Sequence, residues 1–431
     1  MNRSARSASI FFAACSLAAL GCGARTALDG LDASHDGGTD AWSCVPSAER
    51  CNGADDDCDG SVDEGMPLVA LGGEIVLRDA TELDAGDCTS CFWAWSPLLA
   101  PRAQGAWQLF FRIGIYGGRE EPNVFTRTLD PHGAPTSENV SAGSEVAMDL
   151  RAPRPTPLAD GRFVVGATWR IGTDDRGGTM LVAPDGSVTR AVFPVSRTPS
   201  LTLMAGERVV TIAGADRRAE VRSQRVDGSD LRESAIDDTY FTVADAWADR
   251  VGVVVLHVDG DARTLHFALL DALGTVIVPP SPIDVAYDSY PRLVGTSEGW
   301  MIVVPRRNAP ARRALLTREG ALAAPLEPFD DEHVLADAPY GETFVHHPRE
   351  PSIVHVFQSP VGDLDATMHV QVLDEHGHLL RAFEAPAPGS GAVGTPSVAF
   401  AEDGRLLVTW HDVADDSERN RVYVRELGCG D

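Results

Sequence analysis

The sequence predicts an all-β protein from residue 67 onward, on two observations. The apolar residues of this region form short alternating or continuous runs and do not recur at the three- and four-residue spacing of an amphipathic helix. Gly, Pro and Asp separate these runs at short intervals, as they do where tight turns join strands. The chain has 431 residues, of which 44% are hydrophobic, and this is enough for one large core or two medium ones.

A tight turn that closes on glycine recurs along this region and predicts how the strands are grouped. The turns end at Gly133, Gly186, Gly228, Gly274, Gly320, Gly377 and Gly428. Successive glycines lie 42 to 57 residues apart, close to the length of a four-stranded propeller blade. The pattern resembles β-propellers built from Asp-Gly turn repeats, without a WD or kelch signature. We therefore expect a seven-bladed β-propeller over residues 67–431, with tandem β-sandwiches as the alternative.

The strands of each unit differ in their apolar pattern. The strand that leads into the turn alternates in residues 124–129, 265–270, 368–373 and 422–427, which predicts one half-buried face. The preceding strand is more continuously apolar, as in residues 163–165, 253–256, 301–304 and 406–410. Such runs are typical of inner strands that neighbouring blades cover on both faces.

The two ends of the repeat predict how the ring closes. Residues 73–79 form a strand before the first unit, which begins near Ser96, whereas the last unit ends at Asp431 after its third strand. We expect residues 73–79 to pair with residues 420–427 and so to cover both exposed strand edges. This pairing would bring Cys429 near the start of the closing strand.

The N-terminal residues predict export. Arg3 and Arg6 precede an apolar stretch over residues 8–20, which is the pattern of a secretory signal peptide. The stretch is too short to remain as a membrane span, because a hydrocarbon core of about 30 Å needs roughly 20 helical residues. Residues 19–22, Ala-Leu-Gly-Cys, resemble the lipobox of bacterial lipoproteins. The resemblance implies that residues 1–21 are removed and that Cys22 is acylated, which anchors the protein to a membrane.

The residues after Cys22 predict a tether and a destination. Residues 22–43 are rich in Gly, Ala, Asp, Ser and Thr and are expected to form a flexible tether. Gly23 stands where lipoproteins retained at the inner membrane often have aspartate, and this favours the outer membrane or the cell surface. The alternative is an ordinary signal peptide cleaved near Gly21, with Cys22 in a disulfide.

An acidic, cysteine-rich segment over residues 44–66 predicts a metal loop. Asp55, Asp57 and Asp59 occupy alternate positions directly before Gly60, as at the opening of a calcium loop. Asp63 and Glu64 are placed to complete the oxygen ligands. No glutamate stands at the twelfth position counted from Asp55, so a full EF-hand is excluded.

The same segment, C-N-G-A-D-D-D-C-D-G-S-V-D-E at residues 51–64, resembles the metal-binding repeat named after the copper-binding surface protein MopE. This repeat is frequent in exported myxobacterial proteins, and only its name points to copper. Residues 44–65 contain no His or Met, whereas copper prefers imidazole and sulfur ligands, so we expect Ca²⁺. The alternative is a small disulfide knot whose aspartates are only solvated.

The cysteines fit an oxidising compartment. Loss of Cys15 and acylation of Cys22 leave an even number of cysteines, which are Cys44, Cys51, Cys58, Cys88, Cys91 and Cys429. We expect a local bridge between Cys88 and Cys91. Cys429 would then bond one cysteine of the acidic segment, whose other two cysteines would pair with each other.

Charge and motifs exclude several kinds of function. The net charge is −27 and lysine is absent, so nucleic acid and anionic lipid surfaces would repel the chain. The sequence contains no G-x-S-x-G, phosphate-loop, H-E-x-x-H or dinucleotide-binding motif. We expect structural or surface roles for the histidines His346, His347, His355, His369, His376 and His378, and core positions for Trp93, Trp95 and Trp410.

These features predict a lipid-anchored, non-catalytic propeller that serves as a scaffold for an unknown protein or polysaccharide partner. The alternative is a propeller hydrolase or lyase that acts on extracellular polysaccharide. An enzyme would require acid and base residues that converge in the central funnel, with displaced pKa values.

Overall fold

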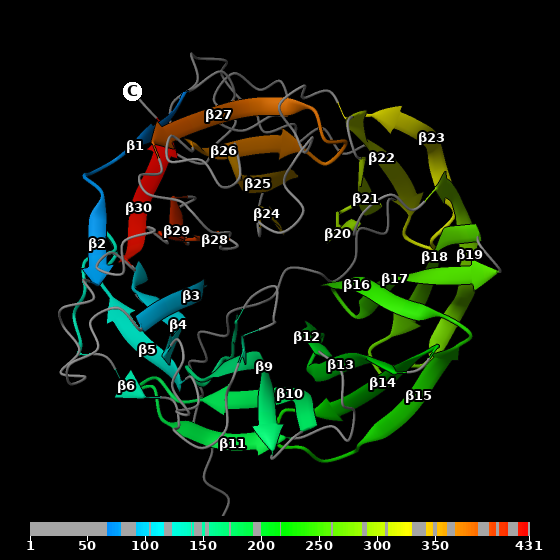
Figure 1. Ribbon diagram of the computed structural model, residues 1–431, viewed down its shortest axis with the longest axis horizontal. Coiled ribbons are helices and arrows are strands. Elements are labelled where there is room, and N and C mark those ends of the chain that lie inside the picture. Colours follow the sequence, from blue (N-terminus) through cyan, green and yellow to red (C-terminus); the bar gives the residue numbers. More distant parts are fainter. Residues whose placement is uncertain are drawn as a thin grey trace, which may run out of the picture. The chain divides into compact units, whose positions relative to one another are not determined.

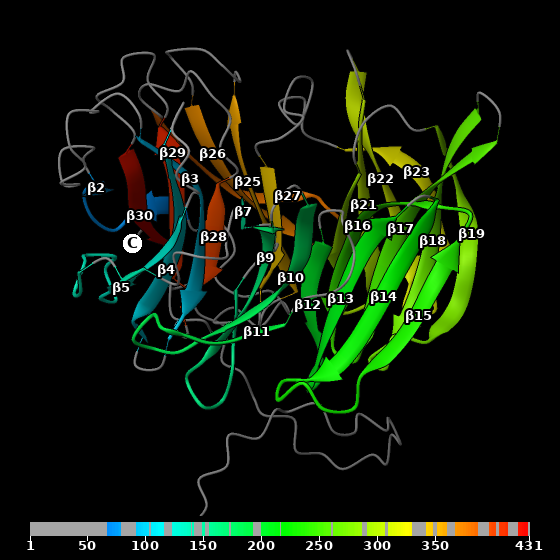
Figure 2. The same ribbon diagram turned by 60° about the horizontal axis from the view of Figure 1, so that its bottom comes forward.

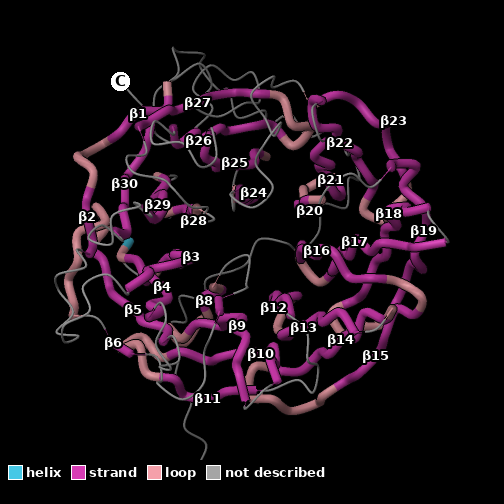
Figure 3. Tube along the Cα trace, in the orientation of Figure 1, coloured by secondary structure: helices cyan, strands magenta, loops and turns pink. Residues whose placement is uncertain are grey.

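The computed structural model divides the chain into two units, Met1–Ser43 and Cys44–Asp431. It describes residues 67–78, 92–102, 105–115, 123–138, 140–141, 149–150, 155–171, 174–192, 200–215, 217–259, 262–286, 291–306, 309–329, 342–347, 351–359, 367–386, 396–401, 405–412 and 421–429. These residues belong to the second unit. They form strands and turns, with a short 3₁₀ segment at Gly105 and no α-helix (Figure 3). None of them forms a helix long and apolar enough to cross a membrane. The predictions for Cys22, residues 44–66, Cys88 and Cys91 lie outside the described residues.

Seven antiparallel sheets form the blades of a β-propeller, as the repeat predicts (Figure 1). From the innermost strand outward, blade 1 contains β3 (Phe92–Pro101), β4 (Trp107–Ile115), β5 (Asn123–Leu129) and β6 (Val140–Ser141). Blade 2 contains β7 (Asp149–Leu150), β8 (Thr156–Pro157), β9 (Phe163–Ile171), β10 (Asp174–Val182) and β11 (Val188–Val192). Blade 3 contains β12 (Ser200–Ala205), β13 (Arg208–Ala215), β14 (Arg218–Arg225) and β15 (Arg232–Asp237).

The next three blades repeat this order. Blade 4 contains β16 (Tyr240–Trp247), β17 (Arg250–Asp259), β18 (Ala262–Asp271) and β19 (Val276–Ala286). Blade 5 contains β20 (Arg292–Gly295), β21 (Gly299–Arg306), β22 (Ala309–Thr317) and β23 (Leu322–Pro328). Blade 6 contains β24 (Glu342–His346), β25 (Ser352–Ser359), β26 (Thr367–Asp374) and β27 (Leu379–Pro386). Figure 2 shows the strands of blades 3 and 4 side by side. The seven sheets are separate and arranged in a ring (Figure 1), which excludes the alternative of tandem β-sandwiches.

Blade 7 is built from both ends of the propeller sequence. It contains β28 (Ser397–Phe400), β29 (Leu406–Asp412) and β30 (Arg421–Cys429), and the outer edge of β30 pairs with β1 (Leu68–Ala70) and β2 (Ile75–Arg78). The predicted closure is confirmed, because Ile75 lies opposite Val424. The strand β1 was not predicted, and it places Leu68 opposite Cys429.

The turn glycines follow the prediction at the first six positions. These glycines have φ values from +79° to +87°, in the left-handed region that glycine adopts without strain. In blade 6, the Gly377 N–H donates to the Asp374 carbonyl at 2.9 Å. One oxygen of the Asp374 side chain accepts the backbone N–H groups of His376 and His378, each at 2.8 Å. The aspartate and the glycine together therefore fix the turn.

The seventh predicted turn is wrong. Gly428 lies within β30, where it pairs with Val69 of β1. A turn is unnecessary at this position because the outer strand of blade 7 comes from the N-terminal side of the propeller. The chain can therefore stay extended through Gly428.

The core of the described residues consists of apolar clusters between neighbouring blades. One cluster joins blades 4 and 5 and includes Phe267 and Trp300, whose ring centroids lie 5.8 Å apart. Another joins blades 6 and 7 and includes Trp410, which stacks on Tyr423 at 5.5 Å. The core position predicted for Trp410 is confirmed, with 2% of the residue exposed. The side chains of Trp93 and Trp95 are not described.

The turn glycines of blades 4 and 5 also allow a close approach to the preceding blade. A Cβ on Gly320 of blade 5 would lie 2.7 Å from the Phe267 ring of blade 4. A Cβ on Gly274 of blade 4 would lie 3.1 Å from Val221 of blade 3. The repeated glycine therefore serves both the turn and the close approach of adjacent blades.

Candidate functional site

A cavity of about 350 Å³ lies among the innermost strands of the propeller. Six blades contribute to its lining, through β3, β12, β16, β24 and β28 and through the region of β8. Most of the lining side chains are apolar, including Leu99, Met204, Trp247 and Phe400. Among the described residues, Asp245 and His346 are the ionisable groups that line this central cavity, and no arginine lines it.

His346 ends the innermost strand of blade 6, and 7% of the residue is exposed. Its ring meets the Trp247 ring of blade 4 nearly edge to face, with centroids 4.2 Å apart. Nε2 lies 2.5 Å from Oε1 of Glu375. An ionised carboxylate only accepts hydrogen bonds, so Nε2 carries a proton, and whenever the ring is neutral the lone pair is on Nδ1. Nδ1 is buried and has no hydrogen-bond partner among the described residues.

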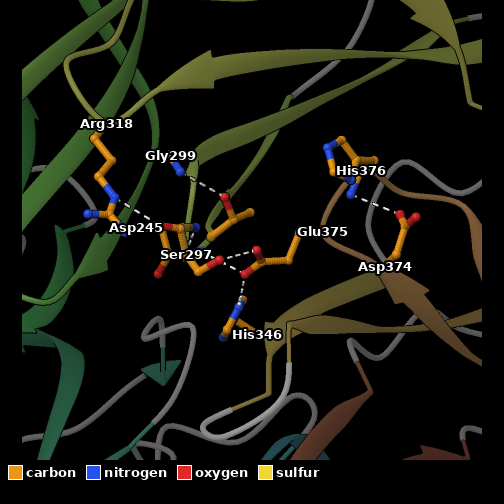
Figure 4. Close-up of polar contacts among 10 residues, drawn as sticks. Asp245, Ser297, Gly299, Arg318, His346, Asp374, Glu375 and His376 are labelled. Carbon is orange, nitrogen blue, oxygen red and sulfur yellow. Dashed lines mark hydrogen bonds and ion pairs between the residues drawn. The ribbon is translucent and has the colours of Figure 1, made fainter. Parts of the chain in front are cut away.

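Glu375 connects His346 to the neighbouring blade. It lies in the turn between β26 and β27 of blade 6, and it reaches the hairpin between β20 and β21 of blade 5 (Figure 4). The backbone N–H of Ser297 donates to Oε1 at 2.6 Å, and the Ser297 hydroxyl donates to Oε2. The Ser297 carbonyl in turn accepts the Arg318 Nε–H at 2.8 Å.

These contacts keep Glu375 ionised. Burial raises the pKa of its carboxyl group, but the hydrogen bonds from His346 and Ser297 outweigh burial and lower the pKa below its ordinary value. A charged Glu375 holds the Nε2 proton of His346 in place. The tautomer and the orientation of the imidazole are therefore fixed from outside the cavity.

Asp245 lies in β16 among apolar neighbours, with 8% of the residue exposed. Its Oδ2 accepts the backbone N–H of Gly295, in blade 5, at 2.9 Å. Gly295 approaches so closely that a Cβ on it would lie 2.7 Å from Cβ of Trp247. The carboxylate and the indole are therefore held in place by the strand of the next blade.

Among the described residues, the lining of the central cavity contains one carboxylate group. Glycoside hydrolysis commonly uses two carboxyl groups that flank the bond to be cleaved. Asp245 is the carboxylate that lines the cavity among the described residues, whereas Glu375 is not part of the lining and both of its oxygens accept hydrogen bonds. The described part of the chain also contains no group of three or more His, Cys, Asp or Glu residues placed to hold a metal ion.

Two other histidines of blade 6, His347 and His355, pack against phenylalanine rings. His355 stacks between Phe344 and Phe357, at centroid distances of 4.0 Å and 4.6 Å. His347 contacts Phe400 and not the partners of His346, as the opposite directions of adjacent side chains predict. His376 and His378 lie in the turn and are about half exposed.

His378 is more constrained than a solvated turn residue. Its Nδ1 lies 2.8 Å from Oδ2 of Asp374, and its Nε2 lies 3.0 Å from Nη2 of Arg313 in blade 5. The turn therefore carries polar contacts to blade 5 through His378, through Glu375 and through His376, whose Nε2 lies 3.5 Å from Oε2 of Glu298.

The sequence alone does not predict that Asp245, Glu375 and Ser297 belong to one site. The one local signal was Asp245, which is a charged residue inside the apolar run of residues 243–247. Glu375 and Ser297 are 78 residues apart and belong to different blades. Their contact depends on which turn reaches which hairpin, and no local pattern encodes this.

Comparisons with known proteins bear on the fold. No family model and no curated protein matches the chain. A protein of unknown function from Dyadobacter fermentans is similar in structure, with a TM-score of 0.50, 14% identity and coverage of 84% of this chain and 99% of that chain. An α-L-arabinanase from Penicillium chrysogenum, complexed with arabinobiose, has a TM-score of 0.46, 15% identity and coverage of 79% and 97%.

The β-propeller domain of the Trilobed protease from Pyrococcus furiosus also has a TM-score of 0.46, with 7% identity and coverage of 78% of this chain and 98% of that chain. At 14% identity, the likeness to the protein from Dyadobacter fermentans shows the fold alone. The likenesses to the arabinanase and to the protease domain, with TM-scores of 0.46, carry no argument. The chain is an all-β protein whose described residues form a seven-bladed β-propeller.

Proposed function

We propose that the chain is an exported, lipid-anchored binding protein without catalytic activity, and that the central cavity of its propeller holds a small ligand. The observation that carries the proposal is the lining of this cavity. Apolar and aromatic side chains surround two polar groups, Asp245 and His346, that other blades hold in fixed orientations. This composition is typical of small-molecule sites, in which a few polar groups orient a mostly apolar ligand.

The anchor and the metal loop of the proposal are supported by sequence. The Ala-Leu-Gly-Cys segment ending at Cys22 supports acylation and a location at the outer membrane or cell surface. The alternating carboxylates of Asp55, Asp57 and Asp59 support Ca²⁺ binding between tether and propeller. In this proposal the tether keeps the propeller close to the membrane, and the calcium loop stiffens the connection.

The anchor and the metal loop have direct tests in the full-length protein. Metabolic labelling with palmitate should mark the wild type and not Cys22→Ser, and equal labelling of both would reject the anchor. Calorimetric titration of the oxidised protein with Ca²⁺ should give binding that disappears in the double variant Asp57→Ala, Asp59→Ala. The absence of calcium binding in the wild type, or its persistence in the variant, would reject the loop.

Methionine methyl NMR tests ligand binding. Met204 lines the cavity, whereas Met180 is buried between blades 1 and 2. The ¹³C-methyl signal of Met204 is assigned by its loss in Met204→Leu. A small-molecule extract of the host envelope should shift this signal and leave the Met180 signal unchanged. If the extract leaves both signals unchanged, or shifts them equally, the cavity is not the binding site.

A second candidate function is a hydrolase or lyase that acts on extracellular polysaccharide. One observation favours it: Glu375 orients His346 with a hydrogen bond at 2.5 Å, as a carboxylate orients a general base. The test is release of reducing sugar or unsaturated sugar from host exopolysaccharide by the wild type and by His346→Gln. The binding proposal expects no release above background from either protein, whereas release that depends on His346 would establish the enzyme.

A further inference from the structure

One buried polar side-chain atom in the lining of the central cavity has no hydrogen-bond partner among the described residues. This atom is Nδ1 of His346. The other ionisable group of the lining, Asp245, already interacts with the protein, in part through its hydrogen bond to the Gly295 N–H. The unmet polar contact in the described lining is therefore at His346 and not at Asp245.

The contact with Glu375 sets the direction of this nitrogen. Nε2 of His346 lies 2.5 Å from Oε1 of Glu375 (Figure 4), and Glu375 does not line the cavity. The two nitrogens of an imidazole point in nearly opposite directions, so Nδ1 points away from Glu375. Since Nε2 carries the proton, Nδ1 of the neutral ring is a hydrogen-bond acceptor. A buried acceptor without a donor costs free energy, and a ligand that donates to it removes this cost.

The rest of the lining favours an uncharged, apolar body. Leu99, Met204, Trp247 and Phe400 contribute apolar and aromatic surface, and no arginine of the described residues lines the cavity. A charged group would have to leave water for these surroundings, which is costly without a partner. An apolar cavity of about 150 Å³ is enough for benzene, so a cavity of about 350 Å³ has room for a molecule of one or two rings.

We propose that the central cavity binds a compact, uncharged molecule with an apolar body and a hydroxyl group, and that this hydroxyl donates to Nδ1 of His346. This inference rests on the proposed binding function and names its ligand class. The apolar body of the ligand packs against Trp247 and Phe400. Glu375 holds the imidazole in the tautomer that accepts the hydrogen bond, so its contact with His346 serves recognition of the ligand.

The test compares alcohols with ketones of nearly the same shape, because a ketone accepts hydrogen bonds but cannot donate one. The ¹³C-methyl signal of Met204 is followed while full-length, detergent-solubilised protein is titrated in mildly alkaline buffer, which favours the neutral ring. The probes are cyclohexanol, borneol and benzhydrol, and then cyclohexanone, camphor and benzophenone. The chain contains no lysine, so the ketones form no imine with a side chain. We expect at least one alcohol to bind at least about fivefold more tightly than its ketone.

A pair of variants assigns the preference to His346. His346→Phe removes both ring nitrogens, and the alcohol should then bind no more tightly than its ketone. His355→Phe is the matched control and should keep the preference, because His355 is a buried histidine of the same blade that is hydrogen-bonded to Gln371 and does not line the cavity. The comparison in the wild type needs no variant, so it decides the proposal even if His346→Phe fails to fold.

The outcomes separate the ligand class from the binding function. Ketones that all bind as tightly as their alcohols would overturn the hydroxyl proposal and leave a binding cavity. An alcohol preference that His346→Phe keeps, or that His355→Phe also loses, would overturn it as well. If no probe shifts Met204 but the envelope extract does, the ligand class is again wrong and the binding function stands. If neither probes nor extract shift Met204, both proposals fail.

Discussion

Glu375 is the residue on which the polar side of the central cavity depends. It accepts hydrogen bonds from His346 of its own blade and from Ser297 of blade 5. Its replacement leaves the buried His346 ring without its orienting partner. The same carboxylate therefore links the geometry of the cavity to the contact between two blades.

We predict that Glu375→Gln destabilises the protein at neutral pH by about 1–3 kcal/mol, the cost of leaving buried polar groups poorly matched. The pKa of Glu375 is lowered in the folded state, so its stabilisation is fully present above the ordinary glutamate pKa of about 4.3 and is lost as the pH falls through the lower folded pKa. Urea unfolding of both proteins from neutral to acidic pH should show the difference shrinking on acidification. A difference that stays constant or grows would contradict this role.

The turn glycines give a second prediction for single residues. Gly320→Ala forces a left-handed backbone on alanine and places its Cβ 2.7 Å from Phe267, whereas Gly105→Ala has a similar φ and no heavy atom nearer than 3.9 Å. Both variants should lose stability from backbone strain. Gly320→Ala should lose at least about 1 kcal/mol more, as overpacked cores do. Equal urea midpoints would show that the turn does not lock blade 5 against blade 4.

Among the elements, the closing strands β1 and β2 complete the ring by pairing with β30. Leu77 of β2 is 3% exposed and belongs to the cluster that joins blades 7 and 1, together with Val422 and Val424 of β30. Apolar packing between blades therefore accompanies the backbone pairing of the closing strand. Both contributions come from residues that are far apart in the sequence.

We predict that Leu77→Ala lowers the free energy of unfolding by about 2–5 kcal/mol, as other large-to-small changes in cores do. The matched control is Leu322→Ala in β23, where the leucine is 51% exposed and the change should stay within about 0.5 kcal/mol. Urea unfolding measures both variants. A loss at Leu77 no larger than at Leu322 would mean that the closing strand contributes little to stability.

The element scale also shows what the sequence could reveal. The repeated turns predicted the blades because the glycine of each turn needs a positive φ, which is a local requirement. The closing strand was predicted because residues 73–79 had no other partner in the repeat. The sequence missed β1 and placed a turn at Gly428, because the local pattern around this glycine does not reveal that an N-terminal strand extends its pairing.

For the whole molecule, the ring is what creates the site. Asp245, His346 and Phe400 come from the innermost strands of blades 4, 6 and 7, and no local pattern indicates that they lie around one cavity. Their meeting depends on the number of blades and on the register of each innermost strand, which sequence periodicity does not determine. The fold could therefore be predicted from repeats, whereas the central cavity required the assembled structure.

Native mass spectrometry of the protein gently released from the host envelope tests the central claim, that this cavity is a binding site, most directly. The account predicts that the wild type carries the additional mass of a small molecule. It also predicts that this mass is absent from Ala246→Phe, in which a larger side chain narrows the cavity. An unchanged unfolding midpoint of Ala246→Phe confirms that the variant is folded. No additional mass on the wild type, or the same mass on both proteins, would contradict the account.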